Sequence, residues 1–166
     1  TKYWPCAMIT TATHDTKRSE DVRARLNVIS EIPDEWREHL FRWSRINKKR
    51  KKAIEGQWIP DRNEEYLLYQ TFLGTWPFHF SGEADYDTFK KRIKDYMLKA
   101  VREAKVNTSW ISPNIPYEEA LLNFIDLILS SPKNNQFIKE FELFQKRISY
   151  FGMFNSLSQT LLKITC

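Results

Sequence analysis

Residues 85–105 read DYDTFKKRIKDYMLKAVREAK, and they form the most regularly patterned stretch of the chain. Apolar side chains recur there at steps of three and four residues, with lysines between them. This period matches the 3.6-residue turn of an α-helix, in which such positions share one face. The stretch therefore predicts a long amphipathic helix that buries one side, and with it a helical fold class.

Similar patterns on either side predict further helices. They cover residues 19–30, 34–47, 64–73, 117–129 and 137–148, with a last segment at 155–164. Ser19 and Asp34 are the expected N-caps, because their side-chain oxygens can accept from the first free backbone N–H groups. Pro33 should end the first helix, and Gly74 should be the C-cap of the 64–73 helix. Gly152 is expected to separate the last two segments.

The remaining stretches are predicted to form one strand and several loops. Tyr3–Thr11 is a short apolar and β-branched run, which is typical of a buried strand. Gly56, Pro60 and residues 61–63 mark a loop. Residues 117–129 are apolar on most of their surface, so this helix is expected near the centre of the bundle. The predicted fold class is mainly α: a multi-helical domain of six to seven helices with one short N-terminal strand-like segment.

The composition is that of a globular protein. The chain has 166 residues, of which 42% are hydrophobic and 14% aromatic, which suits one domain with a substantial core. The net charge is +5, but 21 acidic residues are interleaved with 26 basic ones, so charge alone is weak evidence for a polyanion partner. No apolar run reaches the roughly 18–20 residues of a membrane-spanning helix. Cys6 and Cys166 lie at opposite ends without metal-ligand spacing, which favours a reduced, cytoplasmic setting.

The stretch that most suggests chemistry is TTATHDTKRSEDVRAR, residues 10–25. His14 and Asp15 are adjacent, and two cations, Lys17 and Arg18, follow them. Ser19 then begins a helix whose first turn carries two acids, where the helix dipole favours negative charge. A strand, a loop and a helix in this order would place the polar side chains together on the loop.

Together with four other segments, this stretch resembles one enzyme family. THDTKRSEDVRAR (13–25) resembles the maltooligosyltrehalose synthases, which belong to the α-amylase clan, glycoside hydrolase family 13. Similar segments of that family, in the same order, are NEEYLLYQ (63–70), GTWP (74–77), KAVREAK (99–105) with TSW (108–110), and NSLSQ (155–159). The resemblance covers nearly the whole chain, so the chain is expected to be a fragment from the C-terminal half of such an enzyme.

The resemblance implies a domain division and a set of site residues. Residues 1–18 would be the end of a (β/α)8-barrel strand with its active-site loop, and residues 19–166 would form one compact helical domain. Asp15 would be the catalytic carboxylate that stabilises an oxocarbenium-like transition state. The substrate-binding residues would be His14, Lys17 and Arg18. No cofactor and no metal site is implied.

The residues themselves leave other interpretations open. A His-Asp pair is more often a loop cap or a surface hydrogen bond than a catalytic pair. Lys17 and Arg18 could equally form ion pairs with Glu20 or Asp21.

The activity that the resemblance implies belongs to a longer enzyme. That enzyme is an intramolecular transglycosylase, an isomerase that converts the reducing-end α-1,4 bond of maltooligosaccharides to an α,α-1,1 trehalose bond. The family's nucleophile Asp and acid/base Glu match no residue here, so the isolated chain is expected to be inactive. Expected partners are the maltooligosaccharide and the rest of the barrel, and neither a membrane nor nucleic acid is expected. A homo-oligomer could form through the surface that would face the barrel.

Two functions of other classes remain as alternatives: a basic helical nucleic-acid-binding module, and a scaffold domain without chemistry. Lys48–Lys52, with Arg42 and Arg45, forms a dense cationic patch that could contact phosphates. Cations at a helix C-terminus are, however, favourable without any ligand, and this interpretation is preferred.

Several aromatic side chains are expected in or beside loops, where flat apolar faces could stack on sugar rings. They are Trp58, Trp76, Trp110 and Tyr117. Anchoring of the core is the preferred interpretation for this group.

Overall fold

The computed structural model describes residues 3, 10–130 and 134–165. Its helices are α1 (Glu20–Val28), α2 (Pro33–Asn47), α3 (Arg62–Thr75), α4 (Glu83–Ala104), α5 (Ile115–Ile128) and α6 (Gln136–Thr165). Two 3₁₀ turns, η1 (Ile29–Glu31) and η2 (Lys48–Arg50), follow α1 and α2, and strands β1 (Lys52–Ile54) and β2 (Gln57–Ile59) form a hairpin. Within the described residues, the mainly α fold class is confirmed. Most of the strand predicted at residues 3–11 lies outside them, as do Cys6 and Cys166.

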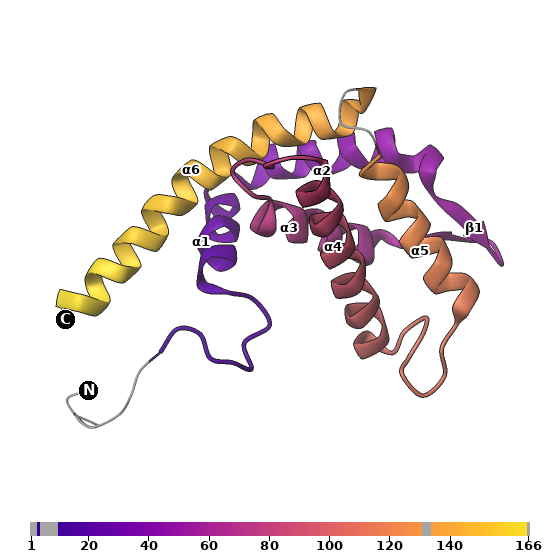
Figure 1. Cartoon of the computed structure of the whole chain (residues 1–166), viewed down its shortest axis with the longest axis horizontal. Helices are drawn as coiled ribbons and strands as arrows, with labels where there is room; N and C mark the ends of the chain where they lie inside the picture. The colour runs from indigo at the N-terminus through magenta and orange to yellow at the C-terminus, as the bar shows by residue number, and fades with distance from the viewer. Residues whose placement is uncertain (1–2, 4–9, 131–133, 166) are drawn as a thin grey trace.

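Helix α6 forms a long arch over the other helices (Figure 1). Helix α3 contacts α6 and also α1, α2 and α4, so α3 is the central helix. Helix α5 instead packs against α4 and the hairpin, toward one end of the molecule. The expectation that residues 117–129 would be central is therefore wrong. The wide apolar surface of α5 is explained by the hairpin, which covers a part of it.

Aromatic rings fill the space between α2, α3 and α6. Trp43 is fully buried, and its ring centroid lies 5.3 Å from that of Phe141 and 5.6 Å from that of Phe144. The ring centroids of Trp36 and Tyr69 lie 5.9 and 5.7 Å from that of Trp43. Most of these pairs meet edge to face, the arrangement that aromatic quadrupoles favour. The heavy aromatic content of the sequence thus mainly builds the core.

Three helix starts show which local signals set the boundaries. Ser19 caps α1 as predicted, because its Oγ accepts from the Val22 N–H at 3.4 Å. Asp61 caps α3 and forms a reciprocal capping box with Glu64, so this helix begins two residues before the predicted start at residue 64. Helix α2 begins at Pro33, which suits the first helical position because that position needs no N–H donor. Asp34 therefore lies inside the helix and is not the N-cap that was expected.

Gly74 and Gly152 lie inside helices, which contradicts the predicted C-cap and the predicted break. Both glycines face α1. A Cβ on Gly74 would lie 2.5 Å from Val22 Cγ1, and one on Gly152 would lie 2.9 Å from Arg25 Cα. Glycine is used here for close approach of two helices, and it lets α1 pack on α3 and α6 together.

Gly74→Ala should lower the free energy of unfolding by about 1–3 kcal/mol, because the added methyl group overpacks the contact with Val22. Alanine is otherwise the better helix former by about 1 kcal/mol, so a stabilised variant would contradict the close packing. Gly82→Ala adds a methyl group without crowding, since nothing lies within 4 Å of its Cβ position. Because Gly82 is the N-cap of α4, this control should show only the cost of a less favoured N-cap residue. Urea unfolding followed by circular dichroism measures both variants.

The β1–β2 hairpin was not predicted, because the sequence indicated a loop there. Glu55 and Gly56 have φ of 50° and 80°, as a two-residue type I′ turn requires. The antiparallel register pairs Ala53 with Trp58. Each strand has three residues, too few for the alternating pattern that identifies a strand in a sequence.

Candidate active-site loop

His14 and Asp15 occupy the apex of a tight turn between residues 13 and 16. The Thr13 N–H donates to Thr16 Oγ1 at 2.8 Å, and the Thr16 N–H donates back to the Thr13 carbonyl at 3.0 Å. At the apex, His14 Nε2 lies 3.1 Å from Asp15 Oδ2, and the two side chains are 91% and 84% exposed. The turn therefore presents a paired imidazole and carboxylate to whatever lies outside this chain.

The base of the loop is tied to α1 and α6. Arg23 Nη1 donates to the Thr11 carbonyl at 2.6 Å, and Thr11 Oγ1 donates to Glu20. From α6, Lys163 Nζ lies 2.6 Å from Glu20 Oε1 and 2.8 Å from Thr11 Oγ1. The hydrogen bonds from Lys163 and Thr11 lower the pKa of Glu20. Lys163, near the C-terminal end of α6, thus contacts the base of the N-terminal loop, and both ends of the described chain lie on the same side of the molecule (Figure 1).

Lys17 and Arg18 turn toward α3 and α4. Arg18 Nη2 donates to Thr71 Oγ1 at 2.9 Å, and its guanidinium lies 4.7 Å from the centroid of the Tyr96 ring. Lys17 Nζ lies 3.3 Å from Glu103 Oε2, in a largely exposed pair. The structure brings His14 and Asp15 together, but it directs the two cations to the helical domain instead of to Glu20 or Asp21.

Thr71, Tyr96 and Glu103 were missed as functional candidates. Arg18 and Thr71 are 53 residues apart, and Lys17 and Glu103 are 86 apart. All three partners lie on helices, where their residue types are common. A single sequence holds no signal that would pair them with the loop.

A second polar cluster joins residues of the segments 99–105 and 108–110 to Glu118 on α5. Arg102 makes a bidentate pair with Glu118 at 2.8 and 2.6 Å, and Thr108 Oγ1 donates to the same carboxylate at 2.6 Å. The Arg102 guanidinium also lies 4.8 Å from the centroid of Trp110. Hydrogen bonds from Arg102 lower the pKa of Glu118. The cluster fixes the connection between α4 and α5.

Glu118→Gln should lower the free energy of unfolding at pH 7 by about 1.5–3 kcal/mol, because Arg102 loses a charge-assisted bidentate partner. The folded pKa of Glu118 is depressed, so its contribution is present above the unfolded pKa and is lost as pH falls through the folded pKa. Urea unfolding of both proteins at pH 7 and at pH 3 should therefore show a smaller difference at pH 3. An equal difference at both pH values would contradict an ionic contribution.

Asn155 and Ser156, in the NSLSQ segment, pack against α1 and do not approach the His14–Asp15 pair. Asn155 Nδ2 donates to the Ala24 carbonyl at 3.1 Å, and Ser156 Oγ donates to Asp21 at 2.7 Å. These bonds hold α6 against the helix that follows the loop.

The basic run Lys48–Lys52 is not a uniformly free cationic surface. The Lys51 side chain is buried, and its Nζ lies 2.8 Å from Glu65 Oε2. Arg50 Nη2 donates to Asn135 Oδ1 at 3.2 Å. Two of the five cations are thus held inside the fold, which weakens the argument for phosphate binding.

In the described ranges, 3, 10–130 and 134–165, none of the helices has the length and the apolar surface that spanning a bilayer requires. Within the same ranges, no group of three or more His, Cys, Asp and Glu side chains could hold a metal ion.

The known proteins that the chain resembles in sequence and in fold are maltooligosyl trehalose synthases. No protein-family model matches it. A Mycobacterium tuberculosis protein, provisionally named a maltooligosyl trehalose synthase, is 37% identical over 131 residues, which are 79% of this chain and 15% of that protein. A crystal structure described as maltooligosyl trehalose synthase is 41% identical, with a TM-score of 0.78 over 93% of this chain and 19% of its own. The maltooligosyltrehalose synthase of Arthrobacter ramosus is 32% identical, with a TM-score of 0.70 over 94% of this chain and 18% of its own.

The sequence identity extends over 79% of this chain and the shared fold over 93% of it. The chain spans only 15% to 19% of the length of the relatives that it matches. It therefore belongs to the maltooligosyl trehalose synthase family, of whose members it covers one segment.

Proposed function

We propose that this chain supplies the active-site loop and a supporting helical domain to a maltooligosyl trehalose synthase of glycoside hydrolase family 13. The observation that carries the proposal is the exposed His14–Asp15 pair at the apex of a loop that is anchored at its base. Residues 1–18 contribute the barrel strand and loop, and residues 19–166 contribute the helical domain. The enzyme acts in the cytoplasm as an isomerase and needs no cofactor.

Asp15 accepts hydrogen bonds from hydroxyls of the sugar that is cleaved, and these bonds strengthen as the sugar ring becomes oxocarbenium-like. His14, 3.1 Å away, holds a further hydroxyl and keeps the carboxylate oriented. Arg18 is held by Thr71 and Tyr96, so it positions the loop. The Lys17 side chain is 71% exposed. Its ammonium group can therefore leave the ion pair with Glu103 and donate to a sugar hydroxyl.

The reaction proceeds in two displacements within one enclosed site. A nucleophile Asp from the rest of the enzyme attacks the anomeric carbon, and an acid/base Glu protonates the leaving glucose oxygen. The bound glucose then turns, and its anomeric hydroxyl gives its proton to the acid/base Glu and attacks the covalent maltooligosyl-enzyme, which forms the α,α-1,1 bond and releases the nucleophile. This chain alone is inactive, because neither the nucleophile nor the acid/base is part of it.

Complementation tests the proposal. This chain is co-expressed with the two flanking segments of the relative that is 41% identical, and the complex is supplied with maltopentaose. A non-reducing, trehalose-capped product is expected, and the flanking segments without this chain should form none. A complex that assembles, as shown by co-purification, but forms no product would contradict the proposal and favour a scaffold role.

A further inference from the structure

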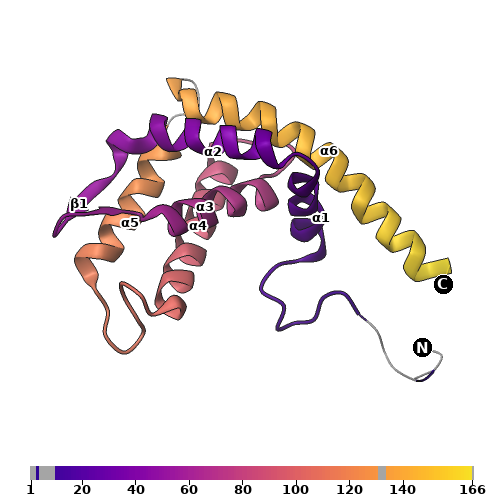
Figure 2. The same ribbon diagram turned by 180° about the vertical axis from the view of Figure 1, so that it is seen from behind.

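Two neighbouring clefts are lined mainly by residues of α2, α3 and the hairpin. In Figure 2 the hairpin and the N-terminal loop lie toward opposite sides of the molecule. One has a volume of about 750 Å³ and the other about 510 Å³. Ser44 and Arg62 line both clefts, so the clefts meet at these two side chains. Volumes of this size are typical of sites that hold small organic ligands.

The larger cleft presents Trp58 from strand β2. The indole is 52% exposed, although its neighbour Ile59 is fully buried. The hairpin that carries Trp58 is anchored by Lys51, whose Nζ donates to the Pro60 carbonyl at 2.9 Å and pairs with buried Glu65 at 2.8 Å. The strand that carries this aromatic side chain is thus fixed beside a solvent-facing cleft, which lowers the ordering cost of binding a ligand there.

The smaller cleft carries two further exposed aromatics. Phe41 on α2 is 66% exposed and Tyr66 on α3 is 41% exposed, and both line the cleft. With Trp58 they place three aromatic side chains along the joined clefts. Such an arrangement suits a ligand that repeats a flat apolar face along its length.

Polar groups between the aromatics are available to a ligand. Lys48, Gln57 and Arg62 line the larger cleft, and their side chains make no hydrogen bond or ion pair with the rest of the described chain. Asp61 uses Oδ1 to cap α3, which leaves Oδ2 as an acceptor. Asn107 donates through Nδ2 to Tyr117 at 2.9 Å, which leaves its amide oxygen. The cleft therefore offers both donors and acceptors, as sugar hydroxyls require.

We propose that the joined clefts form an accessory binding site for α-1,4-linked glucan chains, separate from the His14–Asp15 loop. The choice of an α-glucan rests on the proposed function, because a synthase that acts on maltooligosaccharides meets this ligand. Trp58 stacks on one glucose ring, and Asp61, Arg62 and Asn107 bind hydroxyls around it. The site retains the substrate chain near the enzyme without taking part in the chemistry.

A single-stranded nucleic acid could also use cations and aromatic rings. The joined clefts are lined by two carboxylates, Asp61 and Glu65, and by five cations, Arg37, Arg45, Lys48, Lys51 and Arg62. Glu65 neutralises Lys51, and the remaining cations would also attract phosphate, so the choice of the sugar rests on the proposed function. The salt dependence of binding separates the two ligands, since only phosphate contacts release counterions.

Titration of this chain with maltoheptaose, followed by calorimetry and tryptophan fluorescence, tests the site. Trp58→Ala should raise the Kd at least about tenfold, the loss expected for a central aromatic contact. Trp110→Ala is the matched control, because Trp110 is 55% exposed and lies outside both clefts, and it should change the Kd by less than about twofold. In the unsubstituted chain, the indole N–H resonance of Trp58 should shift on titration and that of Trp110 should not, which needs no variant to fold.

Several outcomes would overturn the inference. They are no binding of maltoheptaose up to its solubility limit, binding that survives Trp58→Ala, and salt-sensitive binding of oligo(dT) in place of the sugar. The variant Asp15→Asn shows whether the sugar binds at the clefts or at the His14–Asp15 loop. If Asp15→Asn abolishes binding and Trp58→Ala does not, the sugar sits at the loop, and the accessory site is wrong while the proposed function stands. Failure of the complementation assay, in contrast, would count against the proposed function itself.

Discussion

Asp15→Asn in the assembled synthase should lower the rate of trehalose-bond formation by about 10³-fold, which corresponds to about 4 kcal/mol of lost transition-state stabilisation. The amide has nearly the same shape as the carboxylate but lacks its charge, and charge-assisted hydrogen bonds are roughly twice as strong as neutral ones. The loss should appear mainly in kcat, because the bonds strengthen only as the sugar ring distorts. Product formation from maltopentaose at saturating substrate measures the effect.

Asp34→Asn is the matched control for this prediction. Asp34 is 86% exposed and pairs with Arg37 on the surface at 3.1 Å, so its replacement should leave the rate and the stability nearly unchanged. Asp15 is 84% exposed, and its replacement should also leave the unfolding curve within about 0.5 kcal/mol. An Asp15→Asn enzyme with a rate close to that of the unsubstituted enzyme would show that another carboxylate stabilises the transition state.

Trp43→Ala should lower the free energy of unfolding by about 3–5 kcal/mol, the cost typical of removing a fully buried large aromatic side chain. Trp43 lies within ring-contact distance of residues from α2, α3 and α6, among them Trp36, Tyr69 and Phe141. The cavity would therefore open where these three helices meet, and it could not close without moving them. Urea unfolding followed by circular dichroism and by tryptophan fluorescence measures the loss.

Two further variants show whether volume or polarity is responsible. The Trp43 Nε1–H is buried and has no hydrogen-bond partner in the described part of the chain, so Trp43→Phe removes an unsatisfied donor while it keeps an aromatic ring. Its cost should be much smaller, about 1 kcal/mol. Trp58→Ala, at the half-exposed position in the hairpin, should change stability by less than about 1 kcal/mol. Equal costs for all three variants would contradict the packing of this core.

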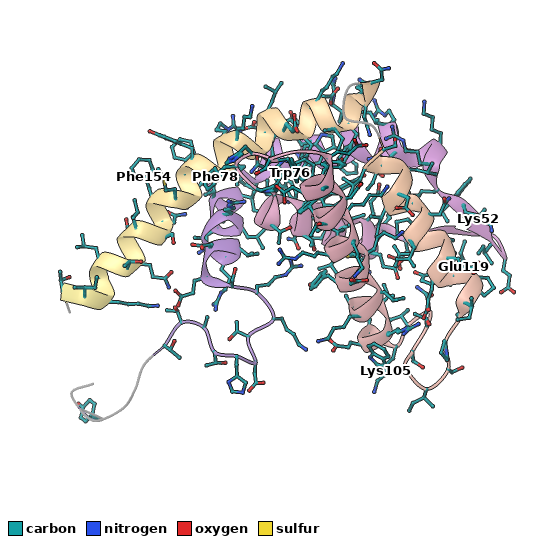
Figure 3. All side chains as sticks on the ribbon, in the orientation of Figure 1. Lys52, Trp76, Phe78, Lys105, Glu119 and Phe154 are labelled. Atoms are coloured by element: carbon teal, nitrogen blue, oxygen red, sulfur yellow. The ribbon has the colours of Figure 1, made fainter. Side chains whose placement is uncertain are left out.

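Helix α6 carries exposed apolar side chains, which is consistent with the proposal that another part of a longer enzyme packs against it. The part of α6 that carries Phe154 extends beyond the other helices (Figure 3), and Phe154, Leu157 and Leu161 are each about half exposed or more. These apolar side chains would lose water contact if the proposed barrel packed against them. Association of the flanking segments with this chain in the complementation experiment should depend on this face.

Local chemistry in the sequence determined much of the fold. The pattern of residues 85–105 predicted α4 to within about two residues, because three- and four-residue spacing of apolar side chains has one simple solution in a helix. The N-cap of α1 could also be predicted, since the Ser19 side chain and the Val22 N–H from which it accepts are three residues apart. The string around His14 and Asp15 indicated the family, and the comparisons confirm it.

Contacts between distant residues were decided only in the tertiary structure. Gly74 and Gly152 looked like helix ends because glycine commonly ends helices, but the close approach of α1 makes both of them interior positions. Arg18 is predicted to bind sugar, and its contacts with Thr71 and Tyr96, which α3 and α4 bring beside it, could be found only in the tertiary structure. The sequence by itself determined the helices and the family, since both depend on residues close together in the chain. Which side chains meet across 50 or more residues, as at Arg18 and Thr71, was decided by packing of the whole domain.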